Sequence, residues 1–218
     1  LYRIIALKDF DGACKGDLGG YVEKESKLSQ FGECWISGYA KVYDDAFVYG
    51  NARISHNVNV FGRAEIYGNA WVYGDAEISG DAEVCGDACI YDNAIIRDNA
   101  KIYEDAKVYE DAIIFGNAQV FGNSIIFEKA TISGGAQVFG NPIICGYTNI
   151  VGESKIYDNR GYITFRNMWC DDDYFTWTKD DDMWHYQDLY LNSEEFKAKA
   201  YGSGERNGKF LDAAIEYA

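Results

Sequence analysis

Residues 74–94 read GDAEISGDAEVCGDACIYDNA, which repeats nearly the same six letters three and a half times. Each repeat places an alanine, then an isoleucine or valine two positions later, and then, one residue further on, a pair drawn from glycine, aspartate and asparagine. A period of six is longer than the alternation within one strand, and it does not match the 3.6-residue turn of a helix. The stretch therefore predicts a series of very short strands separated by turns.

The repeat extends far beyond this stretch. If Ile78 is taken as the marker residue of its hexad, an isoleucine or valine recurs every six residues from Ile36 to Ile156, at all 21 positions and without an insertion. Because side chains alternate in direction along a strand, the marker and the residue two before it both point inward. That preceding residue is alanine 15 times, and the exceptions are Cys34, Val58, Ser124, Pro142, Thr148 and Ser154. Each hexad is therefore expected to form one side and one corner of a coil.

The corner of each hexad has a preference of its own. The third residue after the marker is asparagine or aspartate in 15 of the 21 hexads, from Asp45 to Asn159. These residue types tolerate a left-handed backbone better than most. We therefore expect the positive φ of each corner at this third position.

The pattern resembles the hexapeptide-repeat proteins, an all-β class in which the chain forms a left-handed parallel β-helix of triangular section. The resemblance covers residues 22–159 and implies about seven coils of about 18 residues each. At roughly 4.8 Å per coil the prism would be on the order of 35 Å long. The opening segment GDLGGYVEKE, residues 16–25, more narrowly resembles the YdcK-like hexapeptide proteins of bacteria, phages and prophages.

The regular pattern stops at both ends. Leu28 to Ile36 is eight residues, so residues 1–35 are expected to form an N-terminal cap with an irregular first coil, followed by the repeat β-helix over 36–159. Residues 160–218 are expected to form a small α+β C-terminal cap, since a repeat array needs its ends covered. Its predicted elements are aromatic strands in YITFRNMW and YFTWTKDDDMWHYQDLYL, a helix that begins at the capping-box-like NSEE of residues 192–195 and ends near Gly202, and a second helix over 209–218.

Composition limits the environment and the partners. The 218 residues carry a net charge of -15, of which about -1 lies in residues 1–35, about -8 in 36–156 and about -6 in the rest. An acidic surface of this kind disfavours direct binding to nucleic acid or to an anionic membrane. Nothing in the sequence reads as a secretory signal or a membrane span. Six cysteines without a CxxC pair or metal-ligand spacing fit a reduced cytoplasm.

Function on a solenoid has to come from outward side chains or caps. The coil period sorts the outward residues into three faces, and the first face carries the largest aromatic side chains. Together with the tryptophans of the C-terminal cap, these are the candidate binding residues: Trp35, Trp71, Tyr73, Tyr91, Tyr109, Trp169, Trp177 and Trp184. Stacked aromatic side chains also shield the backbone, so a structural role stays open.

Four outward isoleucines, Ile95, Ile113, Ile125 and Ile143, are expected near one edge of the later coils. An exposed apolar patch usually marks an interface. Two explanations stay open. The patch is either a subunit contact in a homotrimer, the assembly that the hexapeptide resemblance implies, or a surface covered by the tryptophan-rich tail.

Carboxylates follow one corner of the first face: Asp75, Asp92, Glu110, Asp111 and Glu128. Stacked carboxylates can hold a hard cation such as calcium. However, calcium-binding solenoids show a stricter aspartate repeat than this one. We therefore favour a solvated acidic edge over a metal site.

Enzyme activity has little support in the residues. The hexapeptide acyltransferases imply a histidine base, an inserted loop that helps to wall the site, and acyl-CoA bound between subunits. This chain has two histidines: His56 at a corner of the uninterrupted run, and His185 in the cap, where aromatic packing is the simpler explanation. A zinc site on this fold would need three histidines. His56 is therefore the one catalytic candidate, and no cofactor is predicted.

The preferred function is that of a non-enzymatic, acidic binding protein. The YdcK-like resemblance extends to phage proteins, so the partner would be a host protein or a small signalling nucleotide that the chain sequesters or inhibits. The alternative is a hexapeptide-type acyltransferase that holds acyl-CoA between the subunits of a trimer.

Overall fold

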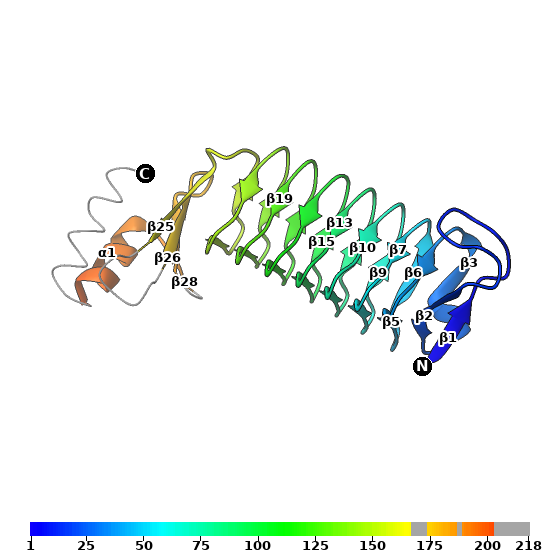
Figure 1. The fold of residues 1–218 in the computed structure, drawn as a ribbon. Coiled ribbons are helices and arrows are strands. Elements are labelled where there is room, and N and C mark those ends of the chain that lie inside the picture. The colour runs from blue at the N-terminus through cyan, green and yellow to red at the C-terminus, as the bar shows by residue number, and fades with distance from the viewer. Residues whose placement is uncertain (167–173, 187–188, 203–218) are drawn as a thin grey trace.

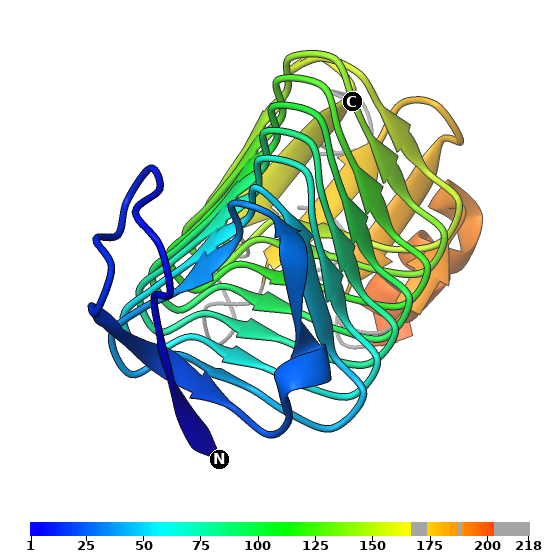
Figure 2. The same cartoon turned by 90° about the vertical axis from the view of Figure 1, so that its right-hand side faces the viewer.

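The computed structural model describes residues 1–166, 174–186 and 189–202. Over most of this length the chain is a parallel β-solenoid whose coils stack along one axis (Figure 1). Viewed along that axis the coil has three sides (Figure 2), and each side is a parallel sheet. Strands 18 positions apart lie side by side, so that Trp71 pairs with Arg53 in one neighbouring coil and with Cys89 in the other. The all-β fold predicted from the hexads is confirmed.

The predicted first face is a seven-stranded sheet. Its strands, in order along the axis, are β4 (Trp35–Ile36), β7 (Arg53–Ile54), β10 (Trp71–Val72), β13 (Cys89–Ile90), β16 (Lys107–Val108), β19 (Ile125–Ile126) and β22 (Ile143–Ile144).

The predicted second face is a nine-stranded sheet. It consists of β1 (Tyr2–Ile5), β2 (Leu18–Val22), β5 (Lys41–Val42), β8 (Asn59–Val60), β11 (Glu77–Ile78), β14 (Ile95–Ile96), β17 (Ile113–Ile114), β20 (Thr131–Ile132) and β23 (Asn149–Ile150). In this sheet β1 is antiparallel to β2, whereas the later neighbours are parallel.

The predicted third face is an eight-stranded sheet. It consists of β3 (Leu28–Gly32), β6 (Phe47–Gly50), β9 (Glu65–Ile66), β12 (Glu83–Val84), β15 (Lys101–Ile102), β18 (Gln119–Val120), β21 (Gln137–Val138) and β24 (Lys155–Ile156). A short 3-10 helix, η1 (Glu25–Lys27), precedes β3. Because β2 and β3 complete an irregular coil, the solenoid has about eight coils rather than the seven that the regular hexads alone predict.

The interior of the solenoid is built from the marker residues and their small partners. Every marker from Ile36 to Ile156 is at most 1% exposed, and the alanines two positions earlier are fully buried. Where serine or threonine replaces alanine, the hydroxyl donates to a carbonyl three residues back: Ser124 to Phe121, and Thr148 to Cys145. The buried polar group is therefore satisfied, and the core register predicted from the sequence is confirmed.

The corner prediction was wrong by one residue. Positive φ occurs at the second position after the marker, as at Gly50 (69°), His56 (63°) and Asp92 (54°), not at the asparagine or aspartate that follows. Glycine is common at this second position because the next coil lies very close: a Cβ on Gly50 would lie 3.0 Å from the backbone nitrogen of Gly68.

The asparagines and aspartates at the third position have a different role. They link successive coils through their side chains: Asn51 Nδ2 donates to Asn69 Oδ1 at 3.1 Å, and Asn69 Nδ2 donates to Asp87 Oδ1 at 3.0 Å. The same link joins Asn57 to Asp75, Asn93 to Asp111, Asn99 to Asn117 and Asn123 to Asn141. Ladders of this kind explain the high frequency of asparagine and aspartate without left-handed backbone.

The C-terminal end of the solenoid is covered by a separate four-stranded antiparallel sheet (Figure 1). It consists of β25 (Tyr162–Arg166), β26 (Tyr174–Thr178), β27 (Met183–Tyr186) and β28 (Leu189–Leu191), and the helix α1 (Ser193–Gly202) follows. Asn192 Oδ1 accepts from the backbone N–H groups of Glu194 and Glu195, and Glu195 Oε2 accepts from the N–H of Asn192. The predicted capping box is therefore confirmed. The second predicted helix, over 209–218, lies outside the described residues.

In the described part of the chain, no helix has both the length and the apolar character needed to cross a bilayer.

Candidate interaction surface

A ladder of aromatic rings runs along the seven-stranded sheet. The rings of Tyr73, Tyr91, Tyr109 and Phe127 come from successive coils, and their centroids are 4.9, 4.6 and 5.1 Å apart with interplanar angles of 2°, 4° and 7°. The 18-residue register places each ring directly beside the one before it. Parallel stacking covers the ring faces and leaves the edges toward solvent, so each of these side chains is half-buried.

The phenols of the ladder stay neutral. Burial, together with the neighbouring phenols of Tyr109 and Tyr73, raises the pKa of Tyr91 to about 12. Burial also raises the pKa of Tyr73 and Tyr109. The ladder therefore offers a row of uncharged hydroxyl groups that can donate or accept hydrogen bonds.

Trp71 lies at the N-terminal end of this ladder. Its ring centroid is 5.3 Å from that of Tyr73, tilted by 50°, and the residue is 54% exposed. A tryptophan this exposed covers little of its own backbone or core. We therefore take Trp71 with Tyr73, Tyr91, Tyr109 and Phe127 as the candidate interaction surface, and name it the aromatic face.

Trp35 does not belong to the aromatic face, although its sequence position predicted it. The residue is 9% exposed because the loop after β1 folds over it: Phe10 packs edge-on against Trp35 with centroids 5.4 Å apart. Ala6 and Ala13 complete this small core. Trp35 is a structural residue of the N-terminal cap.

The cap tryptophans differ from one another. Trp184 is fully buried against Phe175 and Phe196, and its Nε1 donates to Ser193 Oγ at 3.1 Å. It forms the core of the cap, which corrects the prediction that it is available to a partner. Trp177 is half-buried, with Nε1 donating to Asp182 Oδ1 at 2.9 Å. Trp169 lies outside the described residues.

His185 is also a structural residue of the cap. Its Nδ1 accepts from the backbone N–H of Val151 at 3.0 Å, and its Nε2 lies 2.6 Å from Thr178 Oγ1. Asp181 accepts hydrogen bonds from Thr178, Ser154 and Tyr190. Burial lowers the pKa of His185 to about 4, although Asp181 acts in the opposite direction. The imidazole is therefore neutral at pH 7, and its role is polar as well as aromatic.

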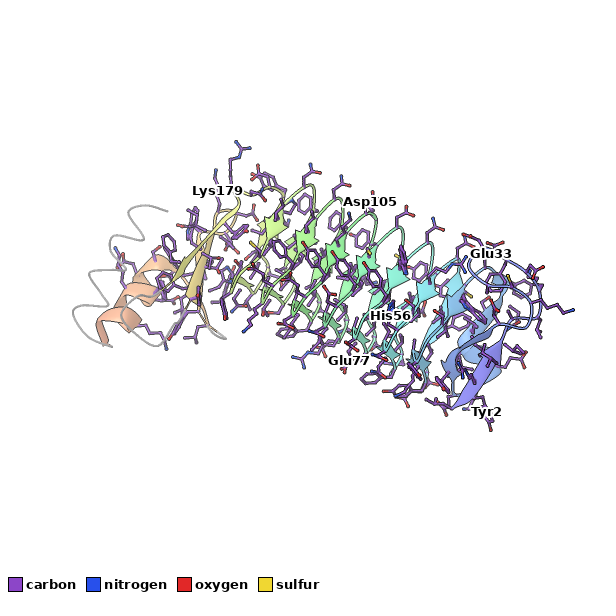
Figure 3. The ribbon with its side chains drawn as sticks, in the orientation of Figure 1. Tyr2, Glu33, His56, Glu77, Asp105 and Lys179 are labelled. Carbon is purple, nitrogen blue, oxygen red and sulfur yellow. The ribbon has the colours of Figure 1, made fainter. Side chains whose placement is uncertain are left out.

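His56 is exposed on the side of the solenoid, where Figure 3 labels it. Its Nδ1 lies 2.9 Å from Ser55 Oγ, and its ring centroid is 6.1 Å from that of Tyr73. The strands continue at the same six-residue interval on both sides, from β4 to β24, with no inserted segment between them. The surface around His56 is thus an open corner, and the lining residues of the described pockets do not include it.

The acidic corner residues make contacts within the protein. Asp75 Oδ1 accepts from Asn57 at 2.7 Å, Asp111 Oδ1 accepts from Asn93 at 3.0 Å, and Glu110 Oε2 accepts from the N–H of Glu128 at 3.0 Å. Asp92, Glu110 and Glu128 occupy positive-φ corners, at 54°, 56° and 56°. Within the described ranges, no three potential ligands among histidine, cysteine, aspartate and glutamate meet in a way that could hold a metal ion.

The four isoleucines form two separate pairs. Ile95 lies beside Ile113 in the nine-stranded sheet, and Ile125 lies beside Ile143 in the seven-stranded sheet. Three of them are half-buried, and Ile143 is 42% exposed. Residues of the C-terminal cap contact the last of them: Tyr162 OH donates to the carbonyl of Ile143 at 2.7 Å.

The sequence reasoning missed the N-terminal end of the solenoid. A cavity of about 680 Å³ opens there, lined by residues of β1, η1 and β3 together with Val22, Cys34 and Trp35. Seven large apolar side chains within residues 1–39 are exposed: Leu1, Tyr2, Ile5, Leu7, Leu18, Phe31 and Tyr39. The available signal was the eight-residue spacing from Leu28 to Ile36, which marks where the regular coil breaks down.

Comparison with known proteins gives one family match. Residues 46–62, which cover β6, β7 and β8, match the family model of the YdcK β-solenoid repeat. No curated protein matches the chain. The matched segment is part of the solenoid, in which the strands of successive coils pair in register. The chain is therefore a repeat β-solenoid protein, and its residues 46–62 are similar to the YdcK β-solenoid repeat.

Proposed function

We propose that the chain is a non-enzymatic binding protein that holds a protein partner against its aromatic face. The observation that carries the proposal is Trp71, which is 54% exposed at the end of a rigid row of stacked rings. Tryptophan and tyrosine commonly supply most of the binding energy at protein interfaces. The rings are already ordered by stacking, so little side-chain entropy is lost when a partner binds.

The geometry of the ladder favours a protein over a small nucleotide. A nucleobase would stack on a ring face, but the faces of Tyr91 and Tyr109 are covered by their neighbours in the ladder. The outward edges instead form a long, flat surface with phenolic hydroxyl groups. The net charge of -15 also repels phosphate groups. Both features favour a protein partner, and the charge favours one with a basic surface.

We place this function in a reducing cytoplasm. The cysteines that the structure describes are all free thiols: Cys14, Cys34, Cys85, Cys89 and Cys145. A phage origin would make the partner a host protein.

A photo-crosslinking experiment tests the proposal. p-Benzoylphenylalanine is placed at Trp71 and, as matched controls, at the exposed Lys155 of the eight-stranded sheet and the exposed Lys41 of the nine-stranded sheet. After irradiation of cells that contain the natural partners, we expect a discrete adduct from position 71 that disappears when Tyr91→Ala is added. Equal adducts from all three sheets, or none from position 71, would refute the aromatic face as the binding site.

A thermal-shift titration with nucleotides separates the two classes of partner. A tight ligand raises the melting temperature by mass action. We expect no shift from nucleoside mono-, di- or cyclic phosphates. A concentration-dependent shift that is lost in Trp71→Ala would replace the protein partner with a nucleotide.

Acyl transfer is the second candidate, and the exposed imidazole of His56 beside Ser55 is the observation in its favour. A free histidine close to a hydroxyl can act as a general base. Release of CoA thiol from acyl-CoA, lost in His56→Ala, would support this candidate over the binding function.

A further inference from the structure

All three solenoid sheets have a terminal strand at the N-terminal end. The terminal strands are β1 of the nine-stranded sheet, β3 of the eight-stranded sheet and β4 of the seven-stranded sheet. A terminal strand can pair with a strand of another chain unless something covers it. In Figure 2 this end faces the viewer, with the dark blue N-terminal strand β1 at its lower left corner.

The cavity at this end lies between two of these strands. It is lined by β1 and the residues after it, by Leu28, Ser29 and Gln30 of β3, and by the buried Cys34 and Trp35. Its volume of about 680 Å³ is within the range of sites that bind drug-sized ligands or protruding side chains. The cavity is therefore large enough to hold an aromatic side chain from outside.

An aromatic side chain protrudes beside the cavity. Phe31 is 87% exposed, the highest value among the large apolar residues described. The pairing of β3 with β6 shifts register between Leu28 and Gly32, and the hydroxyl of Ser29 binds both the N–H (3.1 Å) and the carbonyl (3.0 Å) of Phe31. The bulge produced by the irregular spacing in the sequence thus holds Phe31 away from the core.

The near-neutral charge of this end favours a second copy of the chain as its partner. Residues 1–35 carry about -1 of the total of -15, so this end is nearly neutral whereas the body is acidic. The cavity wall carries both signs: Arg3, Lys8 and Lys24 with Glu23 and Glu25. Two copies of an acidic chain repel each other along their bodies, but here each basic side chain can lie near an acidic one of the other copy.

We propose that two copies of this chain associate through their N-terminal ends, each inserting Phe31 into the cavity of the other. The protruding ring and the cavity lie at the same end, so a two-fold axis satisfies both at once and closes the assembly as a dimer. The contact buries the exposed apolar side chains of residues 1–31 and leaves the aromatic face free. The proposal is thus independent of the function proposed for Trp71.

Light scattering over a range of concentrations tests the dimer. We expect the wild type to reach twice the 24.5 kDa chain mass. Phe31→Ser removes two inserted rings per dimer, and we expect it to raise the dissociation constant by about 100-fold or more. Tyr157→Ser is the matched control, because Tyr157 is 52% exposed at the opposite end of the solenoid, and it should leave the dimer unchanged.

A second measurement locates the contact. With p-benzoylphenylalanine at position 31, irradiation should give a covalent dimer whose crosslinked peptide contains cavity residues of the second copy, such as Leu7 or Leu28. A wild type that stays monomeric at every concentration, or a Phe31→Ser variant that is as dimeric as the wild type, would overturn the proposal. A trimer that is lost in Ile143→Glu would instead move the interface to the isoleucines.

Discussion

The two ends of the solenoid differ in how their terminal strands are covered. At the C-terminal end, side-chain acceptors of the cap take hydrogen bonds from β23, the terminal strand of the nine-stranded sheet, and from the residue after it: Thr176 Oγ1 from the N–H of Asn149, and His185 Nδ1 from the N–H of Val151. These acceptors are fully buried. At the N-terminal end there is a cavity lined by both apolar and charged residues, beside exposed apolar side chains such as Phe31 and Leu7. A buried polar network holds the cap on the C-terminal end, whereas the open cavity leaves the N-terminal end able to receive the second chain proposed above.

The largest expected effect lies in the body that both ends share. Ile90→Asp places a carboxylate in the fully buried interior, where it finds no partner, and it should prevent folding. Lys107→Asp is the matched control, since it adds the same side chain at an exposed position one coil away and should leave the protein folded. Circular dichroism and thermal melting measure both. A soluble, cooperatively melting Ile90→Asp protein would show that the coil register is wrong.

The next effect is specific to the C-terminal end and depends on pH. The folded-state pKa of His185 is about 4, below its ordinary value of 6.5, because the imidazole is buried. Between these two values the unfolded chain binds a proton that the folded chain does not bind. The free energy of unfolding should therefore fall by up to about 3 kcal/mol as the pH drops from 6.5 to 4.

Urea unfolding at a series of pH values measures this dependence. His185→Gln keeps an acceptor near Val151 but cannot titrate, so its stability should change less over the same window. If His185→Gln and the wild type lose stability in parallel, other groups control the acid sensitivity, and the buried network is not what distinguishes the C-terminal end.

The repeat made most of the fold predictable, because every hexad has the same inward and outward positions. The burial of the markers and the alternation of inward and outward residues follow directly from it. The corner was predicted incorrectly because two neighbouring positions have different roles there. The second residue after the marker, such as Gly50 or Asp92, adopts positive φ, and the third forms the side-chain ladder between coils. Frequency alone does not separate these two roles.

The candidate site was less predictable, because exposure depends on segments that do not follow the repeat. Trp35 and Trp71 occupy equivalent positions two coils apart, yet Trp35 is 9% exposed and Trp71 54%. The difference comes from Phe10, which is far away in the sequence and packs on Trp35. Trp184 is likewise buried by the fold of the cap around Phe175 and Phe196. Composition and spacing could not have shown either contact.

A smaller effect on stability, with a large effect on binding, is expected at the aromatic face. Trp71→Ala should change the free energy of unfolding by less than about 0.5 kcal/mol, because the side chain is mostly exposed. Tyr91→Ala breaks two ring stacks and should cost about 1–3 kcal/mol. Both variants should lose the complex that forms through this face. A pull-down with the partner that the crosslinking experiment identifies measures this loss. Retained binding in both variants would move the site to the cap around Trp177.

The smallest expected effect is at His56. This imidazole is exposed at an open corner of the solenoid, and its positive φ of 63° is tolerated by several residue types. His56→Ala should therefore leave the fold, the dimer and partner binding unchanged, and neither this variant nor the wild type should release CoA thiol from acyl-CoA. An acyltransferase that uses His56 as its base would instead lose roughly 100-fold or more in turnover in the variant. His56→Asn is the matched control, because asparagine keeps a polar side chain and accepts the left-handed backbone. If thiol release occurs in the wild type and is lost in both variants, the corner beside the aromatic face is catalytic, and the solenoid body between the two ends is more than a rigid support.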